Sequence, residues 1–389
     1  MWNRVLNVSE DHFFLFGPRG TGKSYWLKEK FPHSLYLDLL DGALYRTLLA
    51  TPERIDDMIP PNYSGVVVLD EIQRVPLLLN EIHRLIEGRA KTQGLLFAMT
   101  GSSARKLRRK GVNLLAGRAL TCRMHPMTAL ELGKDFNLTR TLRYGCLPRV
   151  LLSKNPKDFL ESYVTTYLRE EVQQEGLVRN LEGFSRFLEA ASFSQGSPLN
   201  ISSISSDCAV GRKAVEDYFQ ILEDLLLATR LQVFTRRAKR KLISAPKFYY
   251  FDLGVYRTIR PKGLLDSDFE VDGPSLETLV YQELKALNDY LHSGYAISYW
   301  RTTEDHEVDF ILYGEHGLHA IEVTKTSRIR RADMESLQLF CEDYPQAKAY
   351  FVYGGTRKER FGPIEAWPVE LFLRALPKLM APSVERSLK

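Results

Sequence analysis

The order of apolar and polar positions along the chain predicts alternating strands and helices in its first third. Short, continuous apolar runs are typical of parallel strands buried on both faces when helical patterns separate them. The apolar runs cover residues 12–16, 34–39, 66–69, 95–100 and 119–124, and helical patterns cover residues 24–30 and 77–87. This part of the chain is therefore expected to form an α/β domain with a parallel sheet.

The middle of the chain has mainly helical patterns, without the alternation of strands and helices seen in the first third. Residues 126–176 are helical in pattern, with the longest run at 157–175. Further helices are predicted at 184–193, from residue 200 and at 212–227, with a turn at 207–211 between the last two. The last of these helices carries one apolar stripe, formed by Val215, Tyr218, Phe219, Leu222 and Leu226. Strands are predicted at 230–234 and 247–251. Two short helices, a tight turn and a hairpin favour a winged helix-turn-helix.

The last third predicts a second α/β module. Its pattern indicates a helix at 275–292, strands at 296–300, 308–313 and 318–323, a helix at 333–342 and a strand at 347–353. Because domains average roughly 150 residues, a chain of 389 residues fits two or three of them. We therefore expect three modules, with boundaries at 1–178, 179–260 and 261–389.

Composition narrows the class of protein. With 26% charged and 44% hydrophobic residues and a net charge of +5, the chain is not expected to be disordered. No apolar run approaches the roughly 18 residues needed to span a bilayer, and the first residues do not resemble a cleavable signal. The four cysteines are far apart and form no CxxC pair: Cys122, Cys146, Cys208 and Cys341. A soluble protein of the reducing cytoplasm, without a membrane partner, is expected.

Residues 17–24 match the phosphate-binding pattern GxxxxGK[ST], between a predicted strand and a predicted helix. Backbone N–H groups of such a loop surround phosphates, and the helix N-terminus adds positive potential. Lys23 is expected to reach the β- and γ-phosphates and Ser24 to ligate Mg²⁺, which makes ATP and Mg²⁺ the expected ligands. The predicted nucleotide contacts are Gly17, Pro18, Arg19, Gly20, Thr21, Gly22, Lys23, Ser24 and Tyr25.

Acidic residues follow a second apolar strand. Asp70 and Glu71 come directly after four apolar residues, where a carboxylate can hold the water shell of Mg²⁺. We assign that role to Asp70, and we expect Glu71 to orient or deprotonate the attacking water. A third strand ends in Thr100 and Ser102, either of which could contact the γ-phosphate. We favour Ser102, although an ordinary Thr-Gly-Ser turn explains these residues equally well.

Two arginines are candidates for stabilising the charge that develops in phosphoryl transfer on a neighbouring subunit. They are Arg118 and Arg105, and each taken singly is also consistent with an ordinary surface arginine.

The segments DEIQRVP, TGSSARKL and LAGRAL, together with the phosphate loop, resemble the AAA+ branch of P-loop ATPases. More closely, the chain is similar to a prokaryotic family that joins an AAA domain to a carboxyl-terminal domain of unknown function. The resemblance extends to KFYYFDLGVYR and WRTTEDHEVDF. It implies a parallel-sheet AAA+ ATPase domain with a helical lid, then a winged-helix module and a restriction-endonuclease-like module. It also implies a homo-oligomer, such as a hexameric ring, in which each subunit supplies an arginine to the next site.

The predicted wing carries five cations within six positions: Arg236, Arg237, Lys239, Arg240 and Lys241. Further cations follow the fourth predicted strand of the first module at Arg105, Lys106, Arg108, Arg109 and Lys110. Together they favour contact with a DNA backbone that is sensitive to salt and largely independent of sequence. A solvated charged loop is the alternative. The predicted recognition helix argues against base reading, because its exposed positions include the acids Glu216, Asp217, Glu223 and Asp224.

Three acids in the last module follow the pattern of PD-(D/E)xK nucleases. Glu277 lies on a predicted helix, and Asp309 and Glu322 lie on successive strands, so a pair of carboxylates could gather Mg²⁺. The pattern requires a lysine two residues after the last acid, but that position holds Thr324, and the lysine is Lys325. Because side chains alternate along a strand, Lys325 is expected on the opposite face. We therefore expect a degenerate site that serves for binding.

The leading hypothesis is an AAA+ ATPase that hydrolyses ATP with Mg²⁺ and acts on DNA as a motor or remodelling enzyme. One alternative is a nucleotide-controlled interaction protein that does not involve DNA. Another is an active, ATP-linked, metal-dependent nuclease.

Overall fold

The computed structural model describes residues 2–102, 117–168, 180–263 and 268–381, together with Leu107, Leu115 and Val172. The chain forms two compact units. One consists of Leu6–His125 with Asp224–Leu226, and the other of Met1–Val5, Pro126–Glu223 and Leu227–Lys389. The division at Pro126 differs from the predicted boundaries at residues 178 and 260. The segment predicted as a lid of the ATPase belongs to the second unit.

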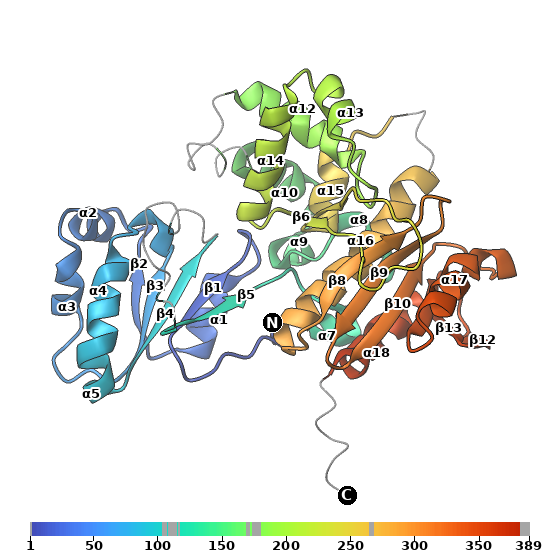
Figure 1. The fold of residues 1–389 in the computed structure, drawn as a ribbon. Helices are drawn as coiled ribbons and strands as arrows, with labels where there is room; N and C mark the ends of the chain where they lie inside the picture. The colour runs from blue at the N-terminus through green and yellow to red at the C-terminus, as the bar shows by residue number, and fades with distance from the viewer. Residues whose placement is uncertain are drawn as a thin grey trace, which may run out of the picture. The chain divides into compact units, whose positions relative to one another are not determined.

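The first unit is built on a five-stranded parallel sheet of order β2-β3-β4-β1-β5 (Figure 1). The strands lie where the apolar runs predicted them: β1 Phe13–Phe16, β2 Leu35–Asp38, β3 Gly65–Asp70, β4 Leu95–Gly101 and β5 Leu120–Arg123. The helices are α1 Lys23–Lys30, α2 Gly42–Ala50, η1 Pro52–Arg54, α3 Ile55–Met58, η2 Ile72–Arg74, α4 Leu78–Leu85, η3 Ile86–Ala90 and α5 Lys91–Gln93. All four side chains of β1 are buried, because helices cover both faces of a parallel sheet.

The strand order determines which strand ends meet. Strand β4 lies between β1 and β3, with Leu15 opposite Thr100 and Leu69 opposite Met99. All three strands are parallel, so their carboxyl ends share one edge of the sheet. The phosphate loop, Asp70 and Glu71 at the end of β3, and the polar end of β4 therefore occupy the same edge, where open α/β sheets bind ligands.

The second unit begins with helices. They are α7 Ala129–Leu132, η4 Gly133–Asp135, α8 Leu138–Tyr144, α9 Pro148–Leu152, α10 Pro156–Ser162, η5 Tyr163–Leu168, α12 Leu181–Ser192, α13 Ile201–Asp207, α14 Arg212–Asp224 and α15 Leu253–Ile259. The predicted stripe on α14 is buried from Val215 to Leu222. The helix ends at Asp224, and Leu226 lies beyond it with a φ of 60°. An antiparallel pair follows, β6 Ala228–Leu231 and β7 Lys247–Tyr250. Assignment of these elements to the winged-helix class stays a prediction.

A mixed six-stranded sheet of order β12-β13-β11-β10-β9-β8 completes the second unit. Its strands are β8 Ala296–Arg301, β9 Glu307–Gly314, β10 Gly317–Val323, β11 Lys348–Tyr353, β12 Glu359–Phe361 and β13 Ile364–Pro368. Its helices are α16 Asp268–Tyr290, η6 Arg331–Met334, α17 Glu335–Asp343 and α18 Val369–Met380. The first four strands and both α16 and α17 were predicted, whereas β12, β13 and α18 were not. Among the described residues, no helix combines the length and the apolar character needed to cross a bilayer.

The loop between β6 and β7 lies along the edge of this sheet. Val233 forms a bridge with Tyr299 of β8, and Leu242 forms one with Thr302, directly after β8. The Phe234 N–H donates to the Tyr299 carbonyl at 2.6 Å. Phe234 is 5% exposed and belongs to the hydrophobic core of the sheet. The loop thereby covers backbone groups that an edge strand would otherwise leave unpaired. The residues on either side of the basic run are thus attached to the sheet.

Candidate functional site

The loop between β1 and α1 has the backbone that the phosphate-binding pattern requires. Gly20 and Gly22 have φ angles of 86° and 94°, in the left-handed region that favours glycine. At Gly17 an added Cβ would come within 2.3 Å of the Met124 carbonyl oxygen, so only glycine fits beneath the loop. Three positions of the motif therefore need glycine for physical reasons.

Lys23 lies inside this loop. Its side chain is buried, and its ammonium donates to the carbonyl oxygens of Gly17 and Pro18 at 2.6 and 3.2 Å. Thr21 is fully buried and donates to the Pro18 carbonyl at 2.8 Å. The ammonium is thus held by two backbone carbonyl groups at the start of the loop. The other predicted contacts include an exposed Arg19 and Tyr25, the latter 46% exposed.

The carboxylate of Asp70 is connected to Ser24, in the first turn of α1, through the hydroxyl group of Tyr36. The Tyr36 hydroxyl donates to Asp70 Oδ2 at 2.5 Å and also hydrogen-bonds to the Ser24 side chain. Thr100 donates to Asp70 Oδ1, so both carboxylate oxygens have partners. Burial and the hydrogen bond to Asp70 raise the pKa of Tyr36 well above its usual value, which keeps this donor protonated. The tertiary structure therefore brings together the two residues predicted to hold Mg²⁺.

Glu71 follows β3 in a left-handed conformation, with φ 62°, which is uncommon for a residue with a side chain. Its N–H donates to the Thr100 hydroxyl at 3.2 Å. Its carboxylate accepts a hydrogen bond from Gln73, whose amide also donates to the Ser102 hydroxyl at 3.3 Å. The predicted water-directing acid and the favoured residue on β4 are thus connected through Gln73.

Gln73 is a residue that sequence reasoning missed. It is 6% exposed, and its Oε1 has no hydrogen-bond partner among the described residues. A buried amide oxygen without a partner costs free energy, so such a group marks a functional or strained place. Its position two residues after Glu71 was the only signal available in the sequence.

Arg118 lies at the opposite edge of the same sheet. It precedes β5, which is parallel to β1, so it is at the amino end while the phosphate loop is at the carboxyl end. It forms an ion pair with Glu87. Hydrogen bonds from Lys91 and Arg118 lower the pKa of Glu87 to about 2. Arg118 is therefore remote from the phosphate loop of its own chain. The other candidate, Arg105, and the neighbouring cations Lys106, Arg108, Arg109 and Lys110 lie outside the described residues.

The acids predicted in the last module do come together. Asp309 of β9 accepts the Val323 N–H at 2.8 Å, next to Glu322 on β10. Glu277 of α16 reaches the same place, and a fourth acid, Glu307 of β9, joins them. We call Glu277, Glu307, Asp309 and Glu322 the acid cluster. Among the described residues, no group of three or more His, Cys, Asp or Glu side chains is arranged to hold a metal ion.

A lysine from another part of the sequence occupies the acid cluster. Lys247 of β7 is fully buried, and its ammonium lies 2.9 Å from Glu277, 2.6 Å from Glu307 and 3.0 Å from Asp309. The lysine expected from the motif, Lys325, is exposed beyond the end of β10. Lys247 begins the KFYYFDLGVYR segment that carries the family resemblance, but the sequence did not indicate its partners, because they come from distant segments.

Burial raises the pKa of Glu277 above its usual value, and the nearby charge of Asp309 acts in the same direction, whereas Lys247 acts against it. Burial likewise raises the pKa of Glu322, whose Oε2 is buried without a hydrogen-bond partner among the described residues. Burial alone would lower the pKa of Lys247, but Glu277 and the neighbouring acids outweigh it and the pKa lies well above its usual value. The ammonium is therefore charged at any physiological pH.

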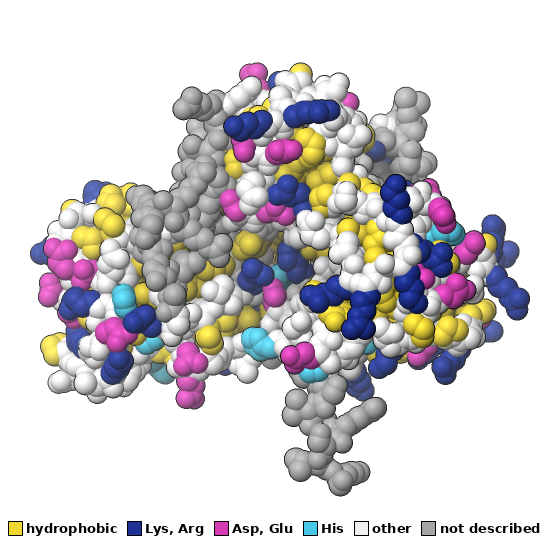
Figure 2. Space-filling model, viewed as in Figure 1, with side chains coloured by type: hydrophobic (Ala, Val, Ile, Leu, Met, Phe, Trp, Pro, Cys, Tyr) yellow, Lys and Arg dark blue, Asp and Glu magenta, His cyan; other side chains and the backbone are white. Residues whose placement is uncertain are grey.

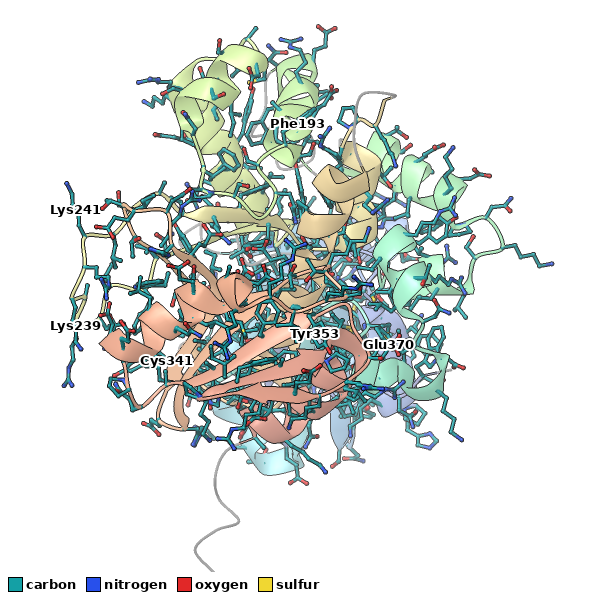
Figure 3. All side chains as sticks on the ribbon, turned by 90° about the vertical axis from the view of Figure 1, so that its right-hand side faces the viewer. Phe193, Lys239, Lys241, Cys341, Tyr353 and Glu370 are labelled. Atoms are coloured by element: carbon teal, nitrogen blue, oxygen red, sulfur yellow. The ribbon has the colours of Figure 1, made fainter. Side chains whose placement is uncertain are left out.

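The five cations of the β6–β7 loop are not equivalent. Arg240 donates to Asp343 at 2.9 Å, and Arg236 lies 4.8 Å from the centre of the Tyr313 ring. Arg237, Lys239 and Lys241 are exposed and have no ion-pair partner among the described residues. Figure 2 shows dark blue side chains gathered over this loop, and Figure 3 shows Lys239 and Lys241 pointing away from the sheet. Arg236 and Arg240 therefore attach the loop to β9 and α17, and the other three cations face solvent.

The strand order, the glycine loop with its lysine and the acids at the neighbouring strand end define the class of P-loop nucleotide-binding domains. Residues 9–133 match the family model described as an AAA domain, so the chain carries an AAA-type domain at its amino-terminal end. Residues 135–265 and 272–372 match two models described as domains of unknown function (DUF8612 and DUF4143).

Similar proteins exist in bacteria and archaea. The chain is 23% identical to Uncharacterized protein Rv2008c of Mycobacterium tuberculosis, over 76% of this chain and 66% of the relative. It thus spans just under two thirds of that relative's length. It is 22% identical to Uncharacterized protein MJ1544 of Methanocaldococcus jannaschii, over 78% and 72%. A variant of RuvB from Thermotoga maritima matches with a TM-score of 0.31 and 15% identity, over 57% of this chain and 82% of that chain. A TM-score this low does not establish a shared overall fold.

Proposed function

We propose that the AAA domain binds ATP with Mg²⁺ and hydrolyses it. The observation that carries this proposal is the meeting of Lys23, Asp70 and Glu71 at one edge of the sheet. Ser24 and Asp70 would hold the magnesium ion, which supplies positive charge to the phosphates and takes few protein ligands. Lys23 would exchange its carbonyl partners for phosphate oxygens. Glu71 would accept a proton from the attacking water.

Gln73 acts in this proposal as a positioning residue for Glu71. Its amide fixes one carboxylate oxygen of Glu71 and connects it to Ser102, so a change at the γ-phosphate can be transmitted to the water-directing acid. A hydrogen bond to a charged group contributes roughly 1.5–3 kcal/mol, equivalent to about 10- to 100-fold in rate.

We expect Gln73→Met, which retains the size of the side chain, to lower kcat about 10-fold or more with little change in KM. Gln73→Glu should be slower still near neutral pH and should recover at acid pH, where a protonated carboxyl again donates to Glu71. Steady-state ATP turnover measured from pH 5 to 8 checks both expectations. Equal pH profiles for the two variants would show that Gln73 has only a structural role.

We further propose that the second unit contacts a nucleic-acid backbone through Arg237, Lys239 and Lys241. Their exposure and lack of ion-pair partners among the described residues support this role. The contact would be non-specific, because α14 offers acids along its exposed face and Glu223 pairs with Arg230 at 2.5 Å. A homo-oligomer with Arg118 serving the neighbouring subunit fits the position of Arg118 opposite the phosphate loop.

Replacing Arg237, Lys239 and Lys241 together by Gln should weaken duplex DNA binding. Each lost phosphate contact lowers the slope of log affinity against log salt by about 0.9. Fluorescence anisotropy at several salt concentrations measures both quantities. The matched control replaces the exposed Lys134, Lys154 and Lys157. If both variants bind like the unmodified protein, the β6–β7 loop is an ordinary solvated loop.

That outcome would favour the second candidate function, a nucleotide-controlled interaction protein. The observation in its favour is the attachment of the β6–β7 loop to the sheet through Phe234 and Arg240. ATP turnover that does not respond to any DNA form would support it.

A further inference from the structure

Lys247 connects elements that are far apart in the sequence. It lies 30 residues from Glu277 and 62 residues from Asp309, and its ammonium contacts both, along with Glu307. The neighbouring Tyr299 ring lies 5.5 Å from the same nitrogen. The lysine side chain has no exposed surface. Strand β7 is therefore fastened to α16 and β9 by a buried ion cluster.

The ammonium lies where the carboxylates converge. Divalent metal ions are bound by carboxylate oxygens at 2.0–2.6 Å, which requires the same oxygens to converge on one point. Oxygens of Glu277, Glu307 and Asp309 already converge on the Lys247 nitrogen, at 2.6–3.0 Å. A second cation among these oxygens would lie within a few ångströms of the first, and the two would repel each other in a poorly solvated place.

A buried lysine in this position satisfies groups that would otherwise be unpaired. Carboxylates are costly to bury unless an opposite charge and hydrogen bonds accompany them. Tyr249, two residues along β7, adds a hydrogen bond to Glu277. The same strand thus supplies both a cation and a hydroxyl donor to the acid cluster.

We propose that Lys247 is the resident cation of the acid cluster and takes the place of a divalent metal ion. The cluster then fastens the β6–β7 hairpin to the C-terminal sheet and does not support metal-dependent cleavage of phosphodiesters. This inference concerns the second unit only, so its test does not depend on whether the first unit hydrolyses ATP.

The test is the melting temperature of the full chain without nucleotide, with and without millimolar Mn²⁺. The unmodified protein should show no shift on adding Mn²⁺. Lys247→Met should melt roughly 10 °C lower, because it leaves buried carboxylates unpaired, and Mn²⁺ should recover several degrees. The double variant Lys247→Met with Asp309→Asn should lose this recovery. The control Lys358→Met removes an ammonium from a single, partly exposed acid, Glu365, and should show neither effect.

A second measurement does not depend on folding of the Lys247 variant. Electron paramagnetic resonance of Mn²⁺ should give the same free-ion signal with the unmodified protein and with Asp309→Asn. Asp309-dependent binding of Mn²⁺ to the unmodified protein would overturn the proposal. So would Mn²⁺-dependent nicking of DNA that Asp309→Asn abolishes, since the lysine would then accompany a metal ion in an active nuclease. Absence of Mn²⁺ recovery in Lys247→Met would also contradict it.

Discussion

Replacing Lys23 by Ala should reduce affinity for ATP by about 100-fold or more and abolish measurable turnover. The ammonium of Lys23 is buried inside the phosphate loop and held by two carbonyl oxygens. Removing one partner of a buried charge pair costs roughly 2–5 kcal/mol, and each 1.4 kcal/mol is a factor of ten. Equilibrium binding of a fluorescent ATP analogue and phosphate release measure the two effects.

The control for this variant is Lys30→Ala, which removes an exposed lysine from the last turn of the same helix. It should bind and turn over ATP like the unmodified protein. Because Lys23 also bonds to the loop itself, the melting temperature of both variants without nucleotide separates loss of the binding site from loss of folding. ATP affinity that survives Lys23→Ala would refute the assignment of this loop.

Replacing Glu71 by Gln should leave ATP binding nearly intact and slow hydrolysis by roughly 10²–10⁴-fold, the range for loss of a general base. Gln retains the size and the acceptor oxygen of the side chain but cannot take a proton from water. Single-turnover hydrolysis and ATP affinity, measured on the same preparation, separate the chemical step from binding. The exposed Glu53→Gln is the matched control.

Hydrolysis at the original rate in Glu71→Gln would show that another group directs the water. Gln73 and Ser102 are the groups to test next, since the Gln73 amide donates hydrogen bonds to both Glu71 and Ser102. A combined Glu71→Gln and Gln73→Met variant should then be no slower than Glu71→Gln alone, because Gln73 acts only through Glu71 in the proposed mechanism.

Features that depend on residues close together in the sequence could be predicted from the sequence. The five apolar runs of the first unit all became strands of one parallel sheet, and the central strands β1, β3 and β4 are largely buried, as the continuous apolar pattern predicts. The motif at residues 17–24 could be interpreted because its glycines, lysine and helix start are consecutive. In the C-terminal sheet Lys325 is exposed beyond the end of β10, so the argument from alternation along the strand is not tested there.

Features that depend on which elements pack together could not be predicted. The insertion of β4 between β1 and β3 puts Thr100 against Asp70 and lets Gln73 connect Glu71 to Ser102. The basic run was expected at a wing tip, and the sequence did not indicate that residues on either side of it pair along β8, where an exposed strand edge gains hydrogen bonds.

By itself, the sequence determined the phosphate loop, the acidic strand end and the alternating strands and helices, since each of these features is formed by consecutive residues. Only the tertiary structure decided that Lys247, rather than Lys325, occupies the acid cluster, 62 residues before Asp309. The physical reason is that a buried charge selects its partners by proximity in space, and the packing of elements creates that proximity between segments that are far apart in the sequence.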